Sequence, residues 1–487
     1  PPTSPYTLGT PNPPFTERVT SMVHWLQEET GGLLTLCAVS IAVLLFLIIK
    51  VKLEPFIALL VSGLALALVA GLSVEEIVGT ALSSKESVLE KGFGGLLGHI
   101  APIVGLGTIL GAILERSGGA DVLTRRLLSV AGERGAPLAM GLAGLIFGIP
   151  VFFDVGIFVL APLVYITARR GGRSLVLYTM PLLAGLSMTH AFLPPHPGAV
   201  AVAGLLEVPL GWLIIFGLIC GIPAFLVAGV AWGAWIGKRI FIEVPDEYIV
   251  AEKDKAEKEA KDPEPEPSLA LVGMIIAVPL VLILLATFST VWWEDSPLLP
   301  ALTFLGNPVV ALTIAVLLAM YLLGIRRGIG TAELSDLAAR SLRPIGMILL
   351  VIGGGAFFGA VVSATGVGKA LATTMSDAGL PVILLAYLIA CGLRIAQGSA
   401  TVAIVTTGGI VAPLVKAEDY SDPHIALIAI AISAGSIIAS HVNDGGFWII
   451  SRYFNMSVRD TIKTWTVLET ILSIVGFAMA AVLSTFI

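Results

Sequence analysis

Charged and helix-breaking residues interrupt apolar sequence at four places in this chain of 487 residues, two in each half. In the first half they fall within 148–156 and 189–198, and in the second half within 394–401 and 440–446. In a bilayer such residues cost on the order of several kcal/mol unless protein or a water-filled cavity surrounds them. They therefore indicate a functional site. Matched interruptions in two halves are typical of secondary transporters built from repeats.

The composition indicates a chain that crosses a membrane several times. Hydrophobic residues make up 56% of the sequence and charged residues only 13%, with a mean hydropathy of +0.95. Soluble domains carry about 25% charged residues. The three cysteines lie in separate apolar stretches and suggest no disulfide framework. We expect an all-α polytopic membrane protein surrounded by lipid, without a nucleic-acid partner.

A charged segment at 241–268, which ends in alternating proline and glutamate, divides the chain. Its composition predicts a solvated linker on the cytoplasmic side. The linker separates a first transmembrane repeat at 33–240 from a second repeat at 269–487. Residues 1–32 are expected to form an extramembrane tail.

Short stretches recur in the same order in the two halves. The recurring stretches are Gly107-x-x-x-Gly111 with Gly355-x-x-x-Gly359, Ala161-Pro162 with Ala412-Pro413, and Thr189-His190 with Ser440-His441. An odd number of membrane crossings before the linker would make the second repeat inverted relative to the first. The glycine pairs themselves predict close helix packing rather than chemistry.

Two segments are predicted to be re-entrant hairpins. Residues 137–167 are too few for two spans of about 20 residues each. Arginines flank them on both sides, so the segment is expected to enter and leave by the cytoplasm, with its tip near 152–154. A single long, tilted helix is the alternative, although it would leave one arginine cluster outside. Residues 380–415 form the second predicted hairpin, with its tip near 397–399.

Two further segments are predicted to be broken transmembrane helices, at 174–206 and 424–454. The first contains three prolines within 194–197, and proline cannot continue the helical hydrogen-bond ladder. Apolar residues at helical spacing over 74–89 predict an interfacial helix. The distribution of lysine and arginine predicts that both termini lie outside.

The four interrupted elements are expected to meet near the middle of the membrane around a small polar anion. Half-helix N-termini at Gly198 and near Gly445 carry partial positive charge, which suits a carboxylate. Arg394 is expected either to bind this anion or to pair with Asp154 or Asp444. The residues predicted to contact substrate are Phe153, Thr189, His190, His196, Gly198, Arg394, Gly398, Ser399, Thr401, His441, Asn443 and Asp444.

Buried titratable groups are candidates for coupling transport to protons. Asp154 and Asp444 are predicted to carry the proton, because a carboxyl group in a membrane can cycle between protonation states. His190, His196 and His441 either titrate or serve as hydrogen-bonded structural residues. A metal site at the first two histidines would lack further ligands, so no metal or other cofactor is expected.

The motif at 189–198, Thr-His-Ala-Phe-Leu-Pro-Pro-His-Pro-Gly, closely resembles His-Gly-Phe-Leu-Pro-Pro-His-Pro-Gly of the bacterial gluconate permease family. Residues 394–403, 441–448 and 463–470 resemble other motifs of that family, and the resemblance extends from about 94 to the C-terminus. It implies a proton-coupled importer of sugar acids, gluconate above all, in the inner membrane. It also implies membership of the ion transporter superfamily, with an elevator motion, commonly a homodimer, and no enzymatic activity.

The chain departs from the family pattern at several positions, which leaves the substrate open. Asp154 stands where relatives often have Glu and Gln397 where they often have Thr, while Ala191 and Gly445 replace Gly and Ser. D-Serine or glycerate is the alternative substrate within the same family. A membrane-embedded hydrolase would need a nucleophile–base pair such as Ser399 with a histidine, but no known protease spacing is present.

Overall fold

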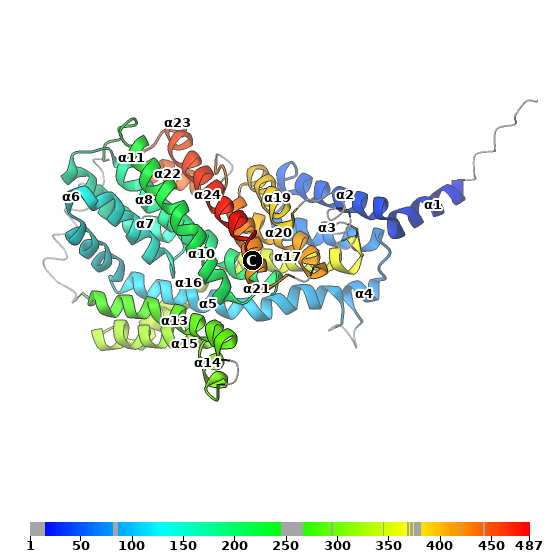
Figure 1. The fold of residues 1–487 in the computed structure, drawn as a ribbon, viewed down its shortest axis with the longest axis horizontal. Helices are drawn as coiled ribbons and strands as arrows, with labels where there is room; N and C mark the ends of the chain where they lie inside the picture. Colours follow the sequence, from blue (N-terminus) through cyan, green and yellow to red (C-terminus); the bar gives the residue numbers. More distant parts are fainter. Residues whose placement is uncertain are drawn as a thin grey trace, which may run out of the picture.

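The computed structural model describes residues 15–80, 86–244, 266–293, 296–343, 345–367, 370, 374, 381–418, 420–441 and 444–487, apart from a few side chains within these ranges. Throughout them the regular structure is helical and no strand occurs. The molecule is elongated, with α6, α7 and α8 towards one end and α1 to α4 towards the other (Figure 1). This confirms the predicted all-α class.

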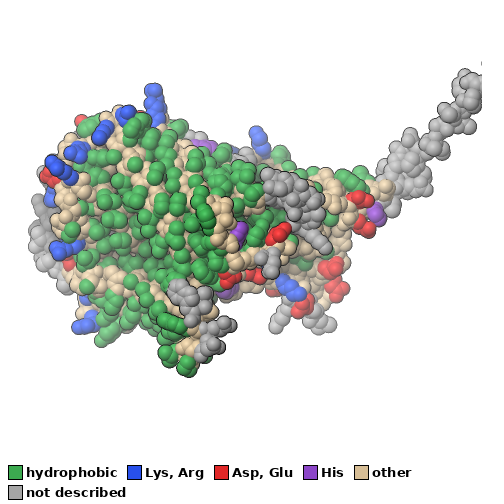
Figure 2. Space-filling view, in the orientation of Figure 1, with side chains coloured by type: hydrophobic (Ala, Val, Ile, Leu, Met, Phe, Trp, Pro, Cys, Tyr) green, Lys and Arg blue, Asp and Glu red, His purple; other side chains and the backbone are tan. Residues whose placement is uncertain are grey.

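Nine helices in the described part of the chain are long and apolar enough to cross a membrane. They are Thr30–Ile48, Glu90–Arg116, Leu175–Leu205, Leu210–Ile236, Leu269–Thr290, Pro308–Arg327, Ile345–Ala364, Ala400–Ala417 and Val458–Leu483. Apolar side chains cover most of the face in Figure 2, with basic side chains gathered at the end formed by α6 and α7. The chain is therefore a multi-pass membrane protein.

The helices of the first half are α1 (Phe15–Glu28), α2 (Thr30–Ile49), α3 (Pro55–Val69), α4 (Val74–Val78), η1 (Glu90–Gly94), α5 (Gly95–Arg116), α6 (Gly119–Gly148), α7 (Phe153–Gly171), α8 (Leu175–Phe192), α9 (Pro197–Leu205), α10 (Leu210–Phe225), η2 (Leu226–Ala231) and α11 (Trp232–Ile236).

Those of the second half are α13 (Leu269–Trp292), α14 (Leu299–Leu305), α15 (Pro308–Ala319), η3 (Met320–Gly324), η4 (Ile325–Arg327), α16 (Thr331–Leu342), α17 (Ile345–Ala364), α19 (Val382–Gln397), α20 (Ala400–Ala417), α21 (Asp422–Gly435), α22 (Gly445–Tyr453), α23 (Val458–Thr461), η5 (Ile462–Thr466) and α24 (Val467–Leu483).

Both predicted hairpins are helix pairs that break at the predicted tips. α6 ends at Gly148 and α7 begins at Phe153, while α19 and α20 are separated by Gly398 and Ser399. Gly398 has φ +89°, a conformation that favours glycine and ends α19. α6 also bends at Gly132, so only its second part pairs with α7 as the first hairpin.

Both predicted broken helices are interrupted where the sequence indicated. α8 ends at Phe192 and α9 begins at Pro197, so three prolines lie at the break or directly after it. The counterpart in the second half ends at Gly435 and resumes at Gly445. α8 is enclosed on all sides by protein, and nearly every residue along it is buried. The first broken helix therefore lies in the core of the molecule.

The two glycine pairs let α5 and α17 approach these interrupted elements closely. A Cβ atom added at Gly107 would lie 2.7 Å from Cγ of Pro195, at the break between α8 and α9. One added at Gly359 would lie 2.7 Å from the carbonyl oxygen of Gly409 in α20. Both distances are shorter than any Cβ contact allows, which confirms the predicted packing role of the glycines.

One predicted helix is wrong. The expected interfacial helix over 74–89 ends after a single turn at Val78, where Gly79 has φ +72°. A capping box of Ser73 and Glu76 caps its N-terminus, so α4 is a short helix with a defined start and a defined end. Most of the linker predicted at 241–268 lies outside the described residues. All three cysteines are buried and free.

Candidate functional site

The four interrupted elements meet at a cavity of about 510 Å³. Four helices begin at its wall: α7 at Phe153, α9 at Pro197, α20 at Ala400 and α22 at Gly445. The N-terminal turn of a helix carries unpaired amide groups and partial positive charge. Four such ends around one cavity make it suitable for an anion.

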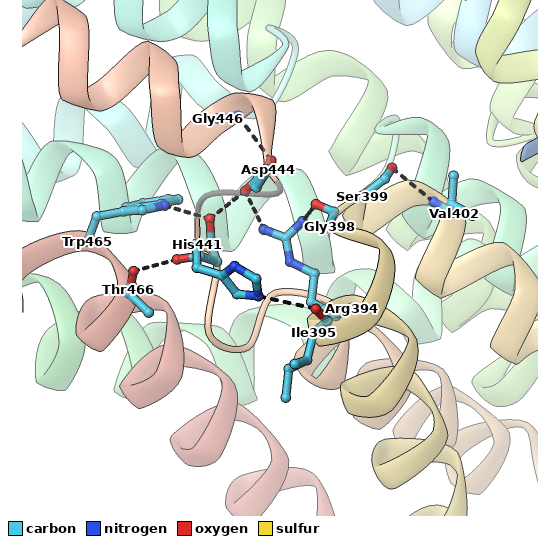
Figure 3. A network of polar contacts seen from close by, with 11 residues as sticks. Arg394, Ile395, Gly398, Ser399, Val402, His441, Asp444, Gly446, Trp465 and Thr466 are labelled. Carbon is cyan, nitrogen blue, oxygen red and sulfur yellow. Dashed lines mark hydrogen bonds and ion pairs between the residues drawn. The ribbon is translucent and has the colours of Figure 1, made fainter. Parts of the chain in front are cut away.

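A buried ion pair forms one side of the cavity (Figure 3). The Nη2 atom of Arg394 lies 2.5 Å from Oδ2 of Asp444, and its Nη1 atom donates to the carbonyl oxygen of Gly398. The hydroxyl group of Ser440 donates to the same carboxylate oxygen, and Trp465 Nε1 donates to that hydroxyl over 2.7 Å. This network joins the second hairpin, the second break and the turn before α24.

Two histidines lie on the other side, His190 in the last turn of α8 and His196 in the break before α9. His196 is buried, and its Nε2 atom lies 2.6 Å from the carbonyl oxygen of Gly148 at the end of α6. The ring of His190 is 5.0 Å from that of His196 and 6.2 Å from the ring of Phe153, centroid to centroid. His196 thus ties the break to the first hairpin, whereas His190 faces the cavity.

Buried polar atoms without a partner gather at this cavity. Among the described residues that line it, His190 Nδ1, Arg394 Nε and Glu469 Oε1 are buried and make no hydrogen bond. Native proteins leave few buried polar atoms unsatisfied, so each one indicates a missing partner. Two nitrogens and a carboxyl oxygen around one space are suited to a ligand that both donates and accepts hydrogen bonds.

The helix ends in the two halves are capped differently. Ser399 accepts a hydrogen bond from the amide of Val402 in α20, and Asp444 accepts one from the amide of Gly446 in α22. α7 and α9 have no side-chain cap. The first half therefore offers uncapped amide groups to a ligand, and the second half offers a fixed charge pair.

Eight of the residues predicted to form the site line the cavity. They are Phe153, Asp154, His190, Arg394, Gly398, Ser399, Thr401 and Asp444. Arg394 was expected either to bind an anion or to pair with Asp154 or Asp444, and the structure shows the pair with Asp444.

Four other predicted site residues lie outside the lining, and Asn443 lies outside the described residues. The hydroxyl group of Thr189 donates hydrogen bonds to backbone carbonyl groups of its own helix. The ring of His196 is hydrogen-bonded to the carbonyl oxygen of Gly148. A Cβ atom at Gly198 would meet Ile404. His441 contacts the carbonyl oxygen of Ile395 at 3.2 Å.

Several residues that line the cavity were assigned no role from the sequence, among them Trp465 and Glu469. Both lie in the segment that resembles a family motif. The sequence signal that could have identified Glu469 is a carboxyl group within an apolar membrane span.

The described residues around the cavity form neither a metal centre nor a hydrolase site. Among the described residues, no group of three His, Cys, Asp or Glu side chains is arranged to hold a metal ion. Ser399 caps α20, and His441 turns its ring nitrogen to a backbone carbonyl group. The arrangement is suited to binding rather than to nucleophilic catalysis.

Comparison with known sequences identifies relatives over almost the whole chain. The model of the GntP family permease matches residues 33–486. A gluconate permease of Pseudomonas aeruginosa is 40% identical over 92% of this chain and 96% of its own. The low-affinity gluconate transporter of Escherichia coli K12 is 37% identical over 90% of this chain and 95% of its own. The inner membrane permease YgbN of the same strain is 40% identical over 92% of this chain and 98% of its own.

Solved transporters share the fold at low sequence identity. The YdaH transporter of Alcanivorax borkumensis has a TM-score of 0.60 and 15% identity, covering 89% of this chain and 98% of its own. MtrF of Neisseria gonorrhoeae has a TM-score of 0.58 and 17% identity, covering 96% and 97%. These likenesses concern the fold alone.

Proposed function

Because this chain belongs to the GntP family of permeases, and is a transporter rather than an enzyme, we propose that it imports gluconate or a closely related sugar acid with protons across the bacterial inner membrane. The observation that carries this proposal is the meeting of four helix N-termini and a buried arginine at one cavity. The relatives named as gluconate permeases support the choice of substrate.

The carboxylate of the sugar acid fits the uncapped amide groups at the start of α7, and the N-terminal turn of α9 adds partial positive charge. Those amide groups lack a side-chain partner, so an anion there replaces lost water contacts without displacing a cap. The unpaired Nε atom of Arg394 adds a charged donor on the opposite side. A neutral sugar would use neither feature.

The hydroxyl groups of the sugar acid fit the remaining lining. Thr401 and Ser399 line the cavity from α20, and His190 presents an unpaired ring nitrogen from α8. D-Serine is less suited, because its ammonium group needs an ionised carboxylate partner and so competes with proton coupling. Glycerate shares the carboxylate and differs in the number of hydroxyl groups.

For proton coupling, Asp154 and Asp444 are the carboxyl groups predicted from the sequence, and both line the cavity. Apart from α1 and α14, each half contains, in the same order, two helices, a short helix, a further helix, a hairpin, a broken helix and a last helix. This order supports two inverted repeats at 33–240 and 269–487, with the arginine-rich ends and the linker in the cytoplasm. An elevator motion and a homodimer complete the proposal.

Uptake by the purified protein in liposomes tests this proposal. A pH gradient, acidic outside, is expected to drive accumulation of radiolabelled gluconate without sodium. Unlabelled gluconate should compete strongly, glycerate and D-serine less, and glucose hardly at all. Equal competition by glucose and gluconate would show that the carboxylate is not recognised. Stronger competition by D-serine than by gluconate would assign the chain to the alternative substrate.

A further inference from the structure

Glu469 lies in the first turn of α24 and lines the cavity, yet no step of the proposed transport uses it. The residue is 1% exposed, and Oε1 has no hydrogen-bond partner. None of the ion pairs among the described residues includes it. An ionised carboxylate buried without a cationic partner is strongly unfavourable, whereas a protonated one is a neutral hydrogen-bond donor.

The charged side chains near this carboxyl group, Arg394 and Asp444, form an ion pair with each other. Arg394 of α19 donates to Asp444 and to the carbonyl oxygen of Gly398. From α8, Ser187 lies beside the Glu469 carboxyl group and His190 faces the same cavity. The other titratable groups on helices packed against α24 are Tyr178 in α8, Cys220 in α10, Tyr387 and Cys391 in α19, Asp422 and His424 in the first turn of α21, and Lys463 in η5.

The two aspartates that the sequence predicted as proton carriers are less suited to this task. A proton on Asp444 would remove its ion pair with Arg394 and weaken the hydrogen bond that it accepts from Gly446. The side chain of Asp154 is exposed at the start of α7, whereas that of Glu469 is enclosed by protein. Glu469 combines burial, contact with the cavity and a free oxygen atom.

We propose that Glu469 carries the coupling proton of this transporter, an inference that rests on the proposed uptake of a sugar acid. The ion pair beside it has no net charge, so an ionised Glu469 would repel the carboxylate of the substrate. A protonated Glu469 removes this repulsion, so by reciprocity the bound anion favours the protonated form. The proton binds from outside and leaves to the cytoplasm after the substrate, which restores the carboxylate.

Glu469→Gln separates coupling from binding, because glutamine mimics the protonated side chain. A pH gradient of two units can drive about 100-fold accumulation by a one-proton symporter. The variant is expected to lose this accumulation and to keep the exchange of internal for external gluconate. Its exchange rate should also no longer depend on pH. Glu75→Gln, on the exposed face of α4, is the matched control and should accumulate gluconate like the wild type.

The outcomes distinguish this inference from the function on which it rests. Full accumulation by Glu469→Gln would overturn the inference and leave gluconate import intact, whereas failure of the wild type to accumulate gluconate would overturn the import itself. Should Glu469→Gln lose exchange as well, the pH profile of exchange by Glu469→Asp decides. A shifted profile supports the proton role, and an unchanged profile refutes it.

Discussion

Each half of the site is built from a hairpin and a broken helix, but the two halves present different polar groups to the cavity. In the second half, Ser399 and Asp444 cap their own helices, and Arg394 is neutralised by an ion pair. In the first half, α7 and α9 start without side-chain caps and His190 keeps an unpaired nitrogen. The comparison teaches that equal backbone breaks need not be equal binding sites, because capping decides which amide groups remain available to a ligand.

The largest effect is expected from breaking the ion pair of the second half. Arg394→Gln leaves Asp444 in place without its cation, which costs about 3–5 kcal/mol in comparable buried pairs. Transport should be abolished and thermal unfolding in detergent should occur at a clearly lower temperature. The double variant Arg394→Gln/Asp444→Asn should recover most of the stability and none of the transport. A single variant as stable as the wild type would show that the pair is not structural.

Filling the glycine contacts should have the next largest effect, and it should differ between the halves. Gly359→Ala meets the backbone oxygen of Gly409, which cannot rotate away, whereas Gly107→Ala meets the ring of Pro195. Overpacking of this kind costs about 1–3 kcal/mol, and we expect the higher value at Gly359. Gly98→Ala in α5 and Gly346→Ala in α17 have open space and are the matched controls. Thermal unfolding of the four variants measures the difference.

Removing the unpaired histidine of the first half should affect affinity more than stability. His190→Phe keeps the ring and loses the nitrogen, and a hydrogen bond to a neutral hydroxyl group contributes about 0.5–1.5 kcal/mol. The dissociation constant for gluconate should therefore rise by roughly twofold to tenfold. His24→Phe, on an exposed side chain of α1, should leave the constant unchanged. Titration of purified protein with gluconate provides the measurement, and equal affinity in both variants would contradict a ligand at His190.

The smallest effects should have opposite signs in the two halves. Ser399→Ala removes the cap of α20 and should lower stability by about 1 kcal/mol, with gluconate affinity little changed. Phe152→Ser places a capping hydroxyl group at the start of α7, so it should add stability while weakening gluconate binding. Thermal unfolding and titration of both variants test this. Weakened binding in Ser399→Ala alone would reverse the assignment of the two halves.

Much of this architecture was predictable because helix breaks depend on residues at the break itself. Three prolines within 194–197 and a glycine at 398 with positive φ interrupt the helices there, so the breaks were found correctly. The apolar spacing over 74–89 misled, because Gly79 ends the helix despite the favourable pattern around it.

The contacts within the site were harder to predict, since they depend on tertiary packing. The composition showed that Arg394 needed a partner in the membrane, but only the fold places Asp444 rather than Asp154 next to it. For the same reason Thr189 appeared available to a substrate, although its hydroxyl group bonds to its own helix. The burial of Glu469 is also invisible to sequence periodicity, because helices from both halves enclose it.

The burial of Cys37, Cys220 and Cys391 has a practical consequence. A membrane-impermeant maleimide should react slowly with the native chain, so accessibility can be mapped without first removing its thiols. One cysteine introduced at Asp154 and another at Thr401 would sample the two sides of the cavity. Labelling from each face of the membrane, with and without gluconate, would then report which side of the transporter is open to water.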